Sequence, residues 1–147
     1  SFNEIFFTSF ESDDYIGNSA DNDSHCGIKS KSDGYSIILT GLTPNKAYVL
    51  TYWQKSGGDW VMQTVNIAAS SATTYPISLT GQVDDVRFFP SGSLMTTYTH
   101  KPLVGVTSVS DPNGVSTFYE YDNFDRLRLI KDDQGKILKT FKYNFKQ

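Results

Sequence analysis

Along much of the chain, hydrophobic and polar positions alternate with a period of two, the pattern of half-buried β-strands. Tyr35, Ile37 and Leu39 share one face of a short segment, and Ile77 and Leu79 share one face of another. No window keeps an apolar stripe at helical spacing over three turns. The pattern therefore predicts an all-β chain without helices.

Residues 48–53 form a continuous aromatic and aliphatic run, which is typical of a central strand. Short runs rich in Gly, Pro, Asn, Asp and Ser separate the strand-like segments and indicate turns. Short strands at this spacing predict an antiparallel β-sandwich. The segment 90–93, Pro-Ser-Gly-Ser, marks the expected boundary between a sandwich at 1–91 and a second region at 92–147.

The second region repeats itself. His100 lies 14 residues before Gly114 (114 − 100), and Tyr121 lies 14 residues before Gly135 (135 − 121). The two units are offset by 21 residues (121 − 100). Self-similarity at a fixed short period indicates one supersecondary unit used more than once.

Each unit is centred on a turn signal, Asp-Pro-Asn-Gly at 111–114 and Asp-Asp-Gln-Gly at 132–135. Asp at the first position accepts backbone hydrogen bonds and Gly at the fourth adopts positive φ, which suits a type I turn with a following bulge. A hairpin alone is marginal in water, so we expect the hairpins to pair with each other, with the sandwich edge or with another chain. The flanks expected to pair are 104–110 with 115–121 and 126–131 with 136–141.

The charge and composition of the chain argue against several classes of binding partner. The net charge of −3 and the pI of about 5.2 offer no basic face to a nucleic acid or to an anionic membrane surface. No run approaches about 18 consecutive apolar residues, so we expect no membrane insertion. The single cysteine, Cys26, excludes an internal disulfide and a zinc site built from several cysteines.

Signals for catalysis are weak. The two histidines, His25 and His100, lie in unrelated segments. Cys26 follows His25, but neighbours on a strand point to opposite faces, so we expect no nucleophile–base pair there. Neither a phosphate-binding glycine loop nor a nucleophile elbow occurs. The sequence therefore predicts a protein that is not an enzyme.

Residues 119–127, Tyr-Glu-Tyr-Asp-Asn-Phe-Asp-Arg-Leu, followed by Gly135 and Tyr143, resemble the YD repeat of the RHS family. The resemblance spans about 96–146, with Asp125 where the family usually has Gly; Asp tolerates the left-handed conformation better than most residues. It implies β-hairpins from a longer bacterial protein that is secreted or on the cell surface, with other RHS repeats of the same chain as partners.

Residues 8–11, 48–53 and 83–89 resemble a jelly-roll carbohydrate-binding module of the galactose-binding-like type. That fold implies that the first and last strands lie side by side. It also implies a structural Ca²⁺ held by an acidic residue from each, here Glu11 with Asp84 or Asp85. Strand alternation would turn Asp84 inward and Asp85 outward, which favours Asp84. The alternative is that these acids are ordinary polar residues at strand ends.

A sugar-binding site needs an exposed aromatic platform with polar neighbours. Trp60, which follows Gly-Gly-Asp, is the best candidate, with Trp53, Tyr15 and Tyr35 as lesser ones. The alternative is that Trp53 and Tyr35 belong to the core.

The leading hypothesis is a non-catalytic extracellular recognition or adhesion module that binds glycans. The rival is a structural cap or scaffold of an RHS repeat shell with no small-molecule ligand. Hairpin edges also offer a route to homo-oligomers.

Overall fold

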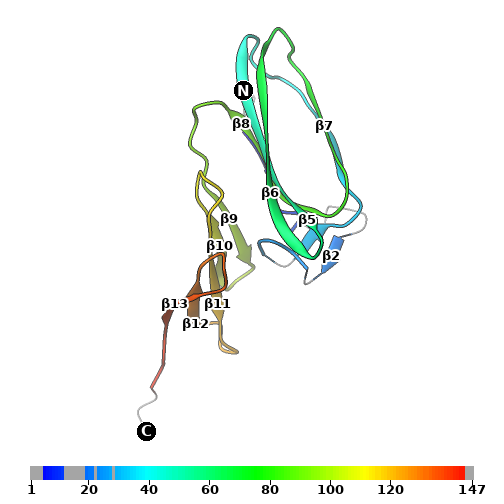
Figure 1. The fold of residues 1–147 in the computed structure, drawn as a ribbon. Helices are drawn as coiled ribbons and strands as arrows, with labels where there is room; N and C mark the ends of the chain where they lie inside the picture. Colours follow the sequence, from blue (N-terminus) through cyan, green and yellow to red (C-terminus); the bar gives the residue numbers. More distant parts are fainter. Residues whose placement is uncertain (1–4, 12–18, 22, 28, 145–147) are drawn as a thin grey trace. The chain divides into compact units, whose positions relative to one another are not determined.

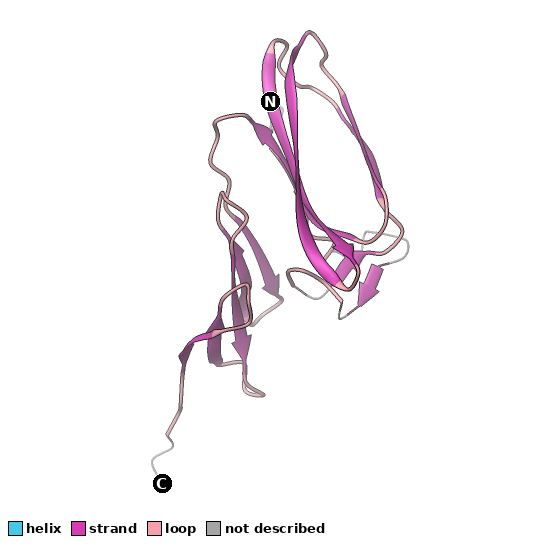
Figure 2. Ribbon diagram, in the orientation of Figure 1, coloured by secondary structure: helices cyan, strands magenta, loops and turns pink. Residues whose placement is uncertain are grey.

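The computed structural model describes residues 5–11, 19–21, 23–27 and 29–144. Every regular element in these ranges is a β-strand, which confirms the predicted all-β fold (Figure 2). This part of the chain therefore contains no helix able to cross a membrane. The structure divides into two compact units, unit 1 at 1–94 and unit 2 at 95–147; the sequence pattern had put the boundary between 91 and 92.

Unit 1 is built from two antiparallel sheets that face each other (Figure 1). The larger has the strand order β2-β3-β8-β5-β6, with β1 also beside β8, and the smaller pairs β4 with β7. The first and last described strands of the unit, β1 and β8, thus lie side by side, as the galactose-binding-like resemblance implies. The bounds are β1 (Phe6–Thr8), β2 (Ser19–Asp21), β3 (Lys29–Lys31), β4 (Tyr35–Leu39), β5 (Lys46–Ser56), β6 (Asp59–Ser70), β7 (Tyr75–Leu79) and β8 (Val83–Pro90).

The core of unit 1 is contributed by both sheets. Alternation along β4 and β7 buries Tyr35, Leu39 and Ile77, as the sequence pattern predicts. Between the sheets, Phe88 of β8 packs against Tyr75 of β7, with ring centroids 5.5 Å apart. Each such side chain contributes about 1.5–3 kcal/mol through removal from water. Packing of side chains from both sheets in one core therefore holds the larger sheet against the smaller one.

Strand β8 carries a β-bulge where it pairs with β5. Thr51 lies opposite Arg87 and Trp53 lies opposite Asp84, so β5 advances two residues while β8 advances three. The extra residue is Asp85, with φ of 47°, a conformation that few non-glycine residues adopt. Every residue of β8 is buried. The expectation that Asp85 points outward was therefore wrong, because simple alternation does not continue through a bulge.

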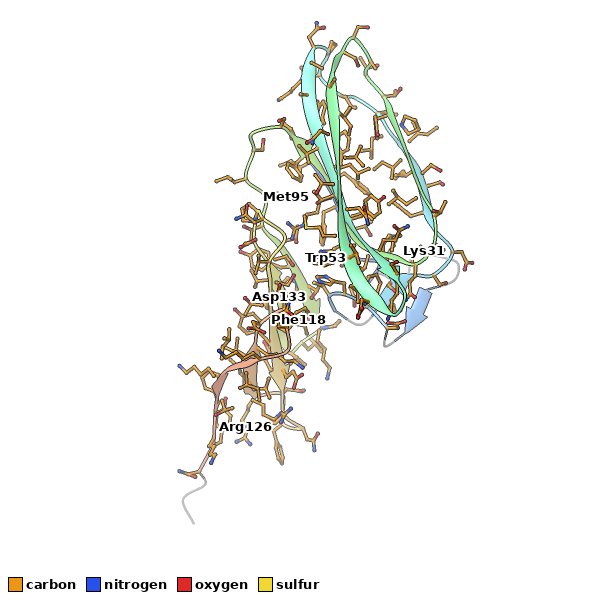
Figure 3. All side chains as sticks on the ribbon, in the orientation of Figure 1. Lys31, Trp53, Met95, Phe118, Arg126 and Asp133 are labelled. Carbon is orange, nitrogen blue, oxygen red and sulfur yellow. The ribbon has the colours of Figure 1, made fainter. Side chains whose placement is uncertain are left out.

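The β5–β6 hairpin ends in a glycine turn. Gly57 and Gly58 have φ of 58° and 94°, which glycine adopts without steric cost. The register places Lys55 opposite Trp60, close to Trp53 on β5. Figure 3 labels Trp53 on this strand.

Unit 2 is one antiparallel meander whose strands follow chain order, β9 to β13 (Figure 1). The pairs β10–β11 and β12–β13 are the two predicted hairpins, and β11 pairs with β12 to join them. Serine and threonine hydroxyls bridge neighbouring strands, as between Ser110 and Ser116 (2.7 Å). The bounds are β9 (Thr97–Lys101), β10 (Gly105–Ser110), β11 (Ser116–Tyr121), β12 (Leu127–Lys131) and β13 (Ile137–Thr140).

Three turns of unit 2 share one hydrogen-bond pattern, at 111–114, 122–125 and 132–135. In each, the N–H of the fourth residue donates to the carbonyl of the first, and the first Asp accepts two backbone N–H groups on its Oδ1. The fourth residue has positive φ, 81° at Gly114, 59° at Asp125 and 80° at Gly135. The turn at 122–125 is thus a third copy, which the 21-residue repeat did not include, and Asp125 adopts the left-handed conformation considered for it from the RHS resemblance.

Candidate functional site

Asp84, in the bulge of β8, organises the loop that contains His25 and Cys26. Its buried carboxylate accepts the N–H groups of His25 (2.8 Å) and Cys26 (3.0 Å) on Oδ2, and that of Asp85 (2.8 Å) on Oδ1. Burial, followed by the neighbouring Asp85 carboxylate, raises the pKa of Asp84 well above its usual value, against the opposite effect of the three N–H groups. This carboxylate joins two segments almost sixty residues apart.

Three side chains with different donor atoms converge beside Asp84. The Nδ1 atom of His25 lies 3.1 Å from Cys26 Sγ and 3.1 Å from Asp85 Oδ2. One ligand atom from each residue lies within 4.8 Å of those of the other two. Cys26 and Asp85 are buried and His25 is nearly so. We call this set the His25–Cys26–Asp85 cluster.

The prediction that the side chains of His25 and Cys26 point to opposite faces was wrong. It assumed that the two residues lie on a strand, whereas 25–27 form a bend in which both side chains turn the same way. The arrangement nonetheless differs from a catalytic triad. In a triad the nucleophile and the acid use different imidazole nitrogens, and here both contact Nδ1.

Two tryptophans surround the imidazole. The His25 ring stacks on Trp53 with centroids 3.7 Å apart and an interplanar angle of 11°, and it meets Trp60 edge-on at 6.2 Å. Lys55 lies over the Trp60 ring, 5.2 Å from its centroid, and forms an ion pair with Asp23. The Lys55 pairing lowers the pKa of Asp23 below its usual value. The predicted ligand-binding residues Trp53 and Trp60 are thus brought together around His25, a residue that was considered for catalysis from the sequence and not for ligand binding.

Glu11 lies near the loop but outside the cluster. Its Oε1 accepts the N–H of Lys29 at 2.8 Å, and its carboxylate fits against Gly27, where a Cβ would come within 2.4 Å of the same oxygen. With Asp84 occupied by three N–H groups and Asp85 facing His25, the three acids predicted to hold Ca²⁺ contact different partners. Calcium binding by Glu11, Asp84 and Asp85 stays a prediction.

The remaining predicted site residues fall elsewhere. Tyr35 is buried in the core, 5.0 Å from Phe10 and 6.4 Å from Phe6 between ring centroids, so it matches the alternative given above. Tyr15 lies outside the described residues. The adjacent pair His25 and Cys26, with two rare donor types side by side, was the signal that could have located the cluster.

Unit 2 presents a different kind of feature, a strand at the edge of the sheet. Among the described strands, β13 pairs with β12 alone, and all four of its residues are exposed. Ile137 and Leu138 are 54% and 56% exposed, which is high for apolar residues in a strand. Such an edge is a template for a further strand.

Comparison with protein families assigns part of unit 2. Residues 104–137 match the family model described as RHS Repeat. The match runs from the residue before β10 to the first residue of β13 and includes the turns at 111–114, 122–125 and 132–135. The comparisons with curated proteins and with solved structures returned no match. Unit 2 therefore contains an RHS-repeat region, and the galactose-binding-like resemblance of unit 1 stays a prediction.

Proposed function

We propose that this chain, whose residues 104–137 form an RHS-repeat region, is a non-catalytic structural segment of a longer surface or secreted protein. In this role unit 2 is one stretch of a repeat sheet, and the next repeat pairs with β13. The exposed edge of β13 is the observation that carries the proposal.

The backbone of β13 is arranged to accept another strand. The N–H of Phe141 donates to the carbonyl of Arg128 on β12 (2.9 Å). Because inward and outward N–H groups alternate along an antiparallel strand, the N–H of Thr140 lies on the outer edge. An added strand would form a hydrogen bond with that N–H group. Ile137 and Leu138 point to opposite faces of the sheet, so side chains of the added strand would cover one or the other.

The repeated contacts support the proposal that further units extend the same sheet. The hydroxyl of Tyr121 donates to the carbonyl of Val106 (2.7 Å), and that of Tyr143 donates to the carbonyl of Leu127 (2.8 Å). Tyr121 ends the second strand of its hairpin and Tyr143 lies three residues after the second strand of the next, and each donates to the first strand of that hairpin. One contact thus recurs in successive units, so a new unit needs no new geometry.

The proposal is tested by adding one unit. A copy of residues 122–143 is joined directly after Tyr143, which takes the place of Tyr121 in the preceding unit, and amide hydrogen exchange is followed at 137–140. We expect slower exchange in β13 because its outer N–H groups acquire partners. Equal exchange rates with and without the added unit would contradict the proposal.

Two substitutions at one position provide the control. Thr140→Pro in the extended chain removes the outward N–H and should abolish the added protection, while Thr140→Val keeps the N–H and should retain it. An appended segment of the same composition in scrambled order should give no protection.

Glycan recognition is the second candidate, favoured by the convergence of Trp53 and Trp60 around His25. One face of Trp53 is covered by the imidazole, and Lys55 lies over Trp60, so neither ring matches a bare platform. Soluble sugars titrated against tryptophan fluorescence distinguish the two roles. A response that Trp60→Ala abolishes supports glycan binding, and silence across a broad panel supports the structural role.

A further inference from the structure

The His25–Cys26–Asp85 cluster combines three donor types that rarely meet by chance in a core. A thiol, an imidazole and a carboxylate come from two segments about sixty residues apart, and they meet in a buried position within 4.8 Å of one another. We propose that this cluster binds one Zn²⁺ ion, which ties the loop at 23–27 to the bulge of β8.

The donor set favours zinc over the hard cations. Calcium and magnesium require oxygen ligands, whereas sulfur and imidazole nitrogen suit borderline transition metals, of which zinc is the common redox-inert one. A thiolate and a carboxylate together carry two negative charges, which balance Zn²⁺, and neutral imidazole adds the third bond. Water completes a four-coordinate site.

The distances already approach those of a zinc site. With bonds of about 2.0–2.3 Å to N, O and S, neighbouring ligand atoms around a tetrahedral Zn²⁺ lie roughly 3.4–3.6 Å apart. The pairs Cys26 Sγ–His25 Nδ1 and His25 Nδ1–Asp85 Oδ2 are both 3.1 Å, so each needs to open by only a few tenths of an ångström. The thiol and the carboxylate lie within 4.8 Å and would be drawn together by the ion.

The surroundings hold the donors in place. Asp84 fixes the backbone of His25 and Cys26 through their N–H groups, and Trp53 stacks on the imidazole. Asp85 adopts a left-handed backbone, a strained conformation for a residue with a side chain, and this turns its carboxylate toward His25. Neighbours that orient metal ligands in this way are a general property of metal sites.

The test is a titration of the full chain, stripped with a chelator and kept reduced with a phosphine, with Zn²⁺ alone. We expect saturation at one equivalent, a rise in melting temperature of about 5 °C or more, and release of the thiol proton to the buffer in calorimetry. Because His25 lies on Trp53, tryptophan fluorescence should change with the same stoichiometry. Co²⁺ in place of Zn²⁺ should give a thiolate-to-metal charge-transfer band.

Variants assign the effect to the cluster. Cys26→Ser, Asp85→Asn and His25→Gln should each weaken Zn²⁺ binding at least tenfold, while His100→Gln, the other histidine, should leave it unchanged. Asn tolerates the left-handed backbone at position 85, so that variant preserves the bulge. Trp53→Phe should remove most of the fluorescence response and keep the rise in melting temperature.

A second measurement covers a variant that fails to fold. Saturating Zn²⁺ should protect Cys26 of the unaltered chain from alkylation at least tenfold. The proposal is overturned by an unchanged melting temperature with Zn²⁺, by equal binding in folded Cys26→Ser, or by equal alkylation rates. Stabilisation by Ca²⁺ alone would also overturn it, in favour of the oxygen ligands Glu11, Asp84 and Asp85.

Discussion

Unit 1, with two antiparallel sheets, and unit 2, with one, are specified by different kinds of contact. In unit 2, neighbouring strands are neighbours in the sequence, and each turn carries its own hydrogen bonds. In unit 1, β8 pairs with β1, about eighty residues earlier, and the core joins two sheets. Local turn chemistry therefore defines unit 2, whereas unit 1 depends on burial and on a few polar groups that join distant segments.

The two units also differ in the regularity of their backbone. Unit 2 repeats one turn and one tyrosine contact, and it exposes an edge that can be extended. The chemically distinctive residues of unit 1 gather where regularity fails, at the bulge of Asp84 and Asp85. The repeated turns and strands of unit 2 suit the addition of further units, while the single β-bulge of unit 1 positions a buried polar cluster.

The largest expected effect comes from removing a core side chain of unit 1, on which the stability of that unit depends. Phe88→Ala in unit 1 removes a ring that is 1% exposed and should lower the free energy of unfolding by about 3–5 kcal/mol. Phe124→Ala in unit 2 removes a ring that is 74% exposed and should cost about 0.5 kcal/mol or less. Chemical denaturation followed by circular dichroism measures both. Comparable losses would contradict the assigned difference between the units.

The next prediction compares two carboxylates that accept backbone N–H groups. Asp84→Ala leaves three N–H groups without their acceptor in a buried place and should cost about 3 kcal/mol or more. Asp111→Ala removes the acceptor for Asn113 and Val115 in a hydrated turn and should cost about 1 kcal/mol. Denaturation midpoints at fixed pH distinguish them, and equal costs would show that burial does not decide the outcome.

A smaller effect tests whether the three turns are equivalent. Gly135→Ala places a side chain at φ of 80°, with open space around the new Cβ, so a loss of about 1 kcal/mol is backbone strain alone. Asp125→Gly relieves the same strain at φ of 59° and should leave stability unchanged or raise it by up to about 1 kcal/mol. Thermal melts of both variants suffice. A large loss in Asp125→Gly would show that this turn relies on its aspartate side chain.

The smallest effect is electrostatic. Hydrogen bonding to Lys131, with Arg128 on the other oxygen, holds the pKa of Glu120 below its usual value of 4.5. Because folding lowers this pKa, the stabilisation is present above pH 4.5 and is lost as pH falls through the folded value. Glu120→Gln should remove about 0.5 kcal/mol above pH 5 and nothing at low pH, since the pair is partly hydrated. A denaturation series from pH 3 to 6 measures the slope.

Alternation and turn chemistry were enough to predict the all-β fold and both hairpins of unit 2. The 21-residue repeat did not include the third turn, and only the RHS resemblance pointed to a left-handed residue there, at Asp125, whose φ is 59°. Residues that tolerate a conformation without requiring it give a weak signal.

Only part of the cluster in unit 1 was predicted, because the β-bulge in β8 and the bend at His25 and Cys26 interrupt the regular strand pattern. Asp84, Asp85, Trp53 and Trp60 were identified as residue types with possible chemistry, but a period-two pattern does not reveal an inserted residue in β8. The contact between His25 and Cys26 depends on a bend held by Asp84, and that acceptor lies almost sixty residues away. A local sequence pattern cannot predict hydrogen bonds between residues so far apart in the chain.

The turns of unit 2 have a genetic consequence. Those at 111–114 and 132–135 are separated by 21 residues (132 − 111) and by two strands, so they lie at the same end of the meander. An in-frame duplication of one such unit adds two antiparallel strands, so the chain returns to the same end of the meander. The side chains downstream then stay on their original faces. Duplication of a single strand would reverse the direction of everything downstream. Growth of such a gene by whole pairs of strands is thus the route that leaves existing pairings undisturbed.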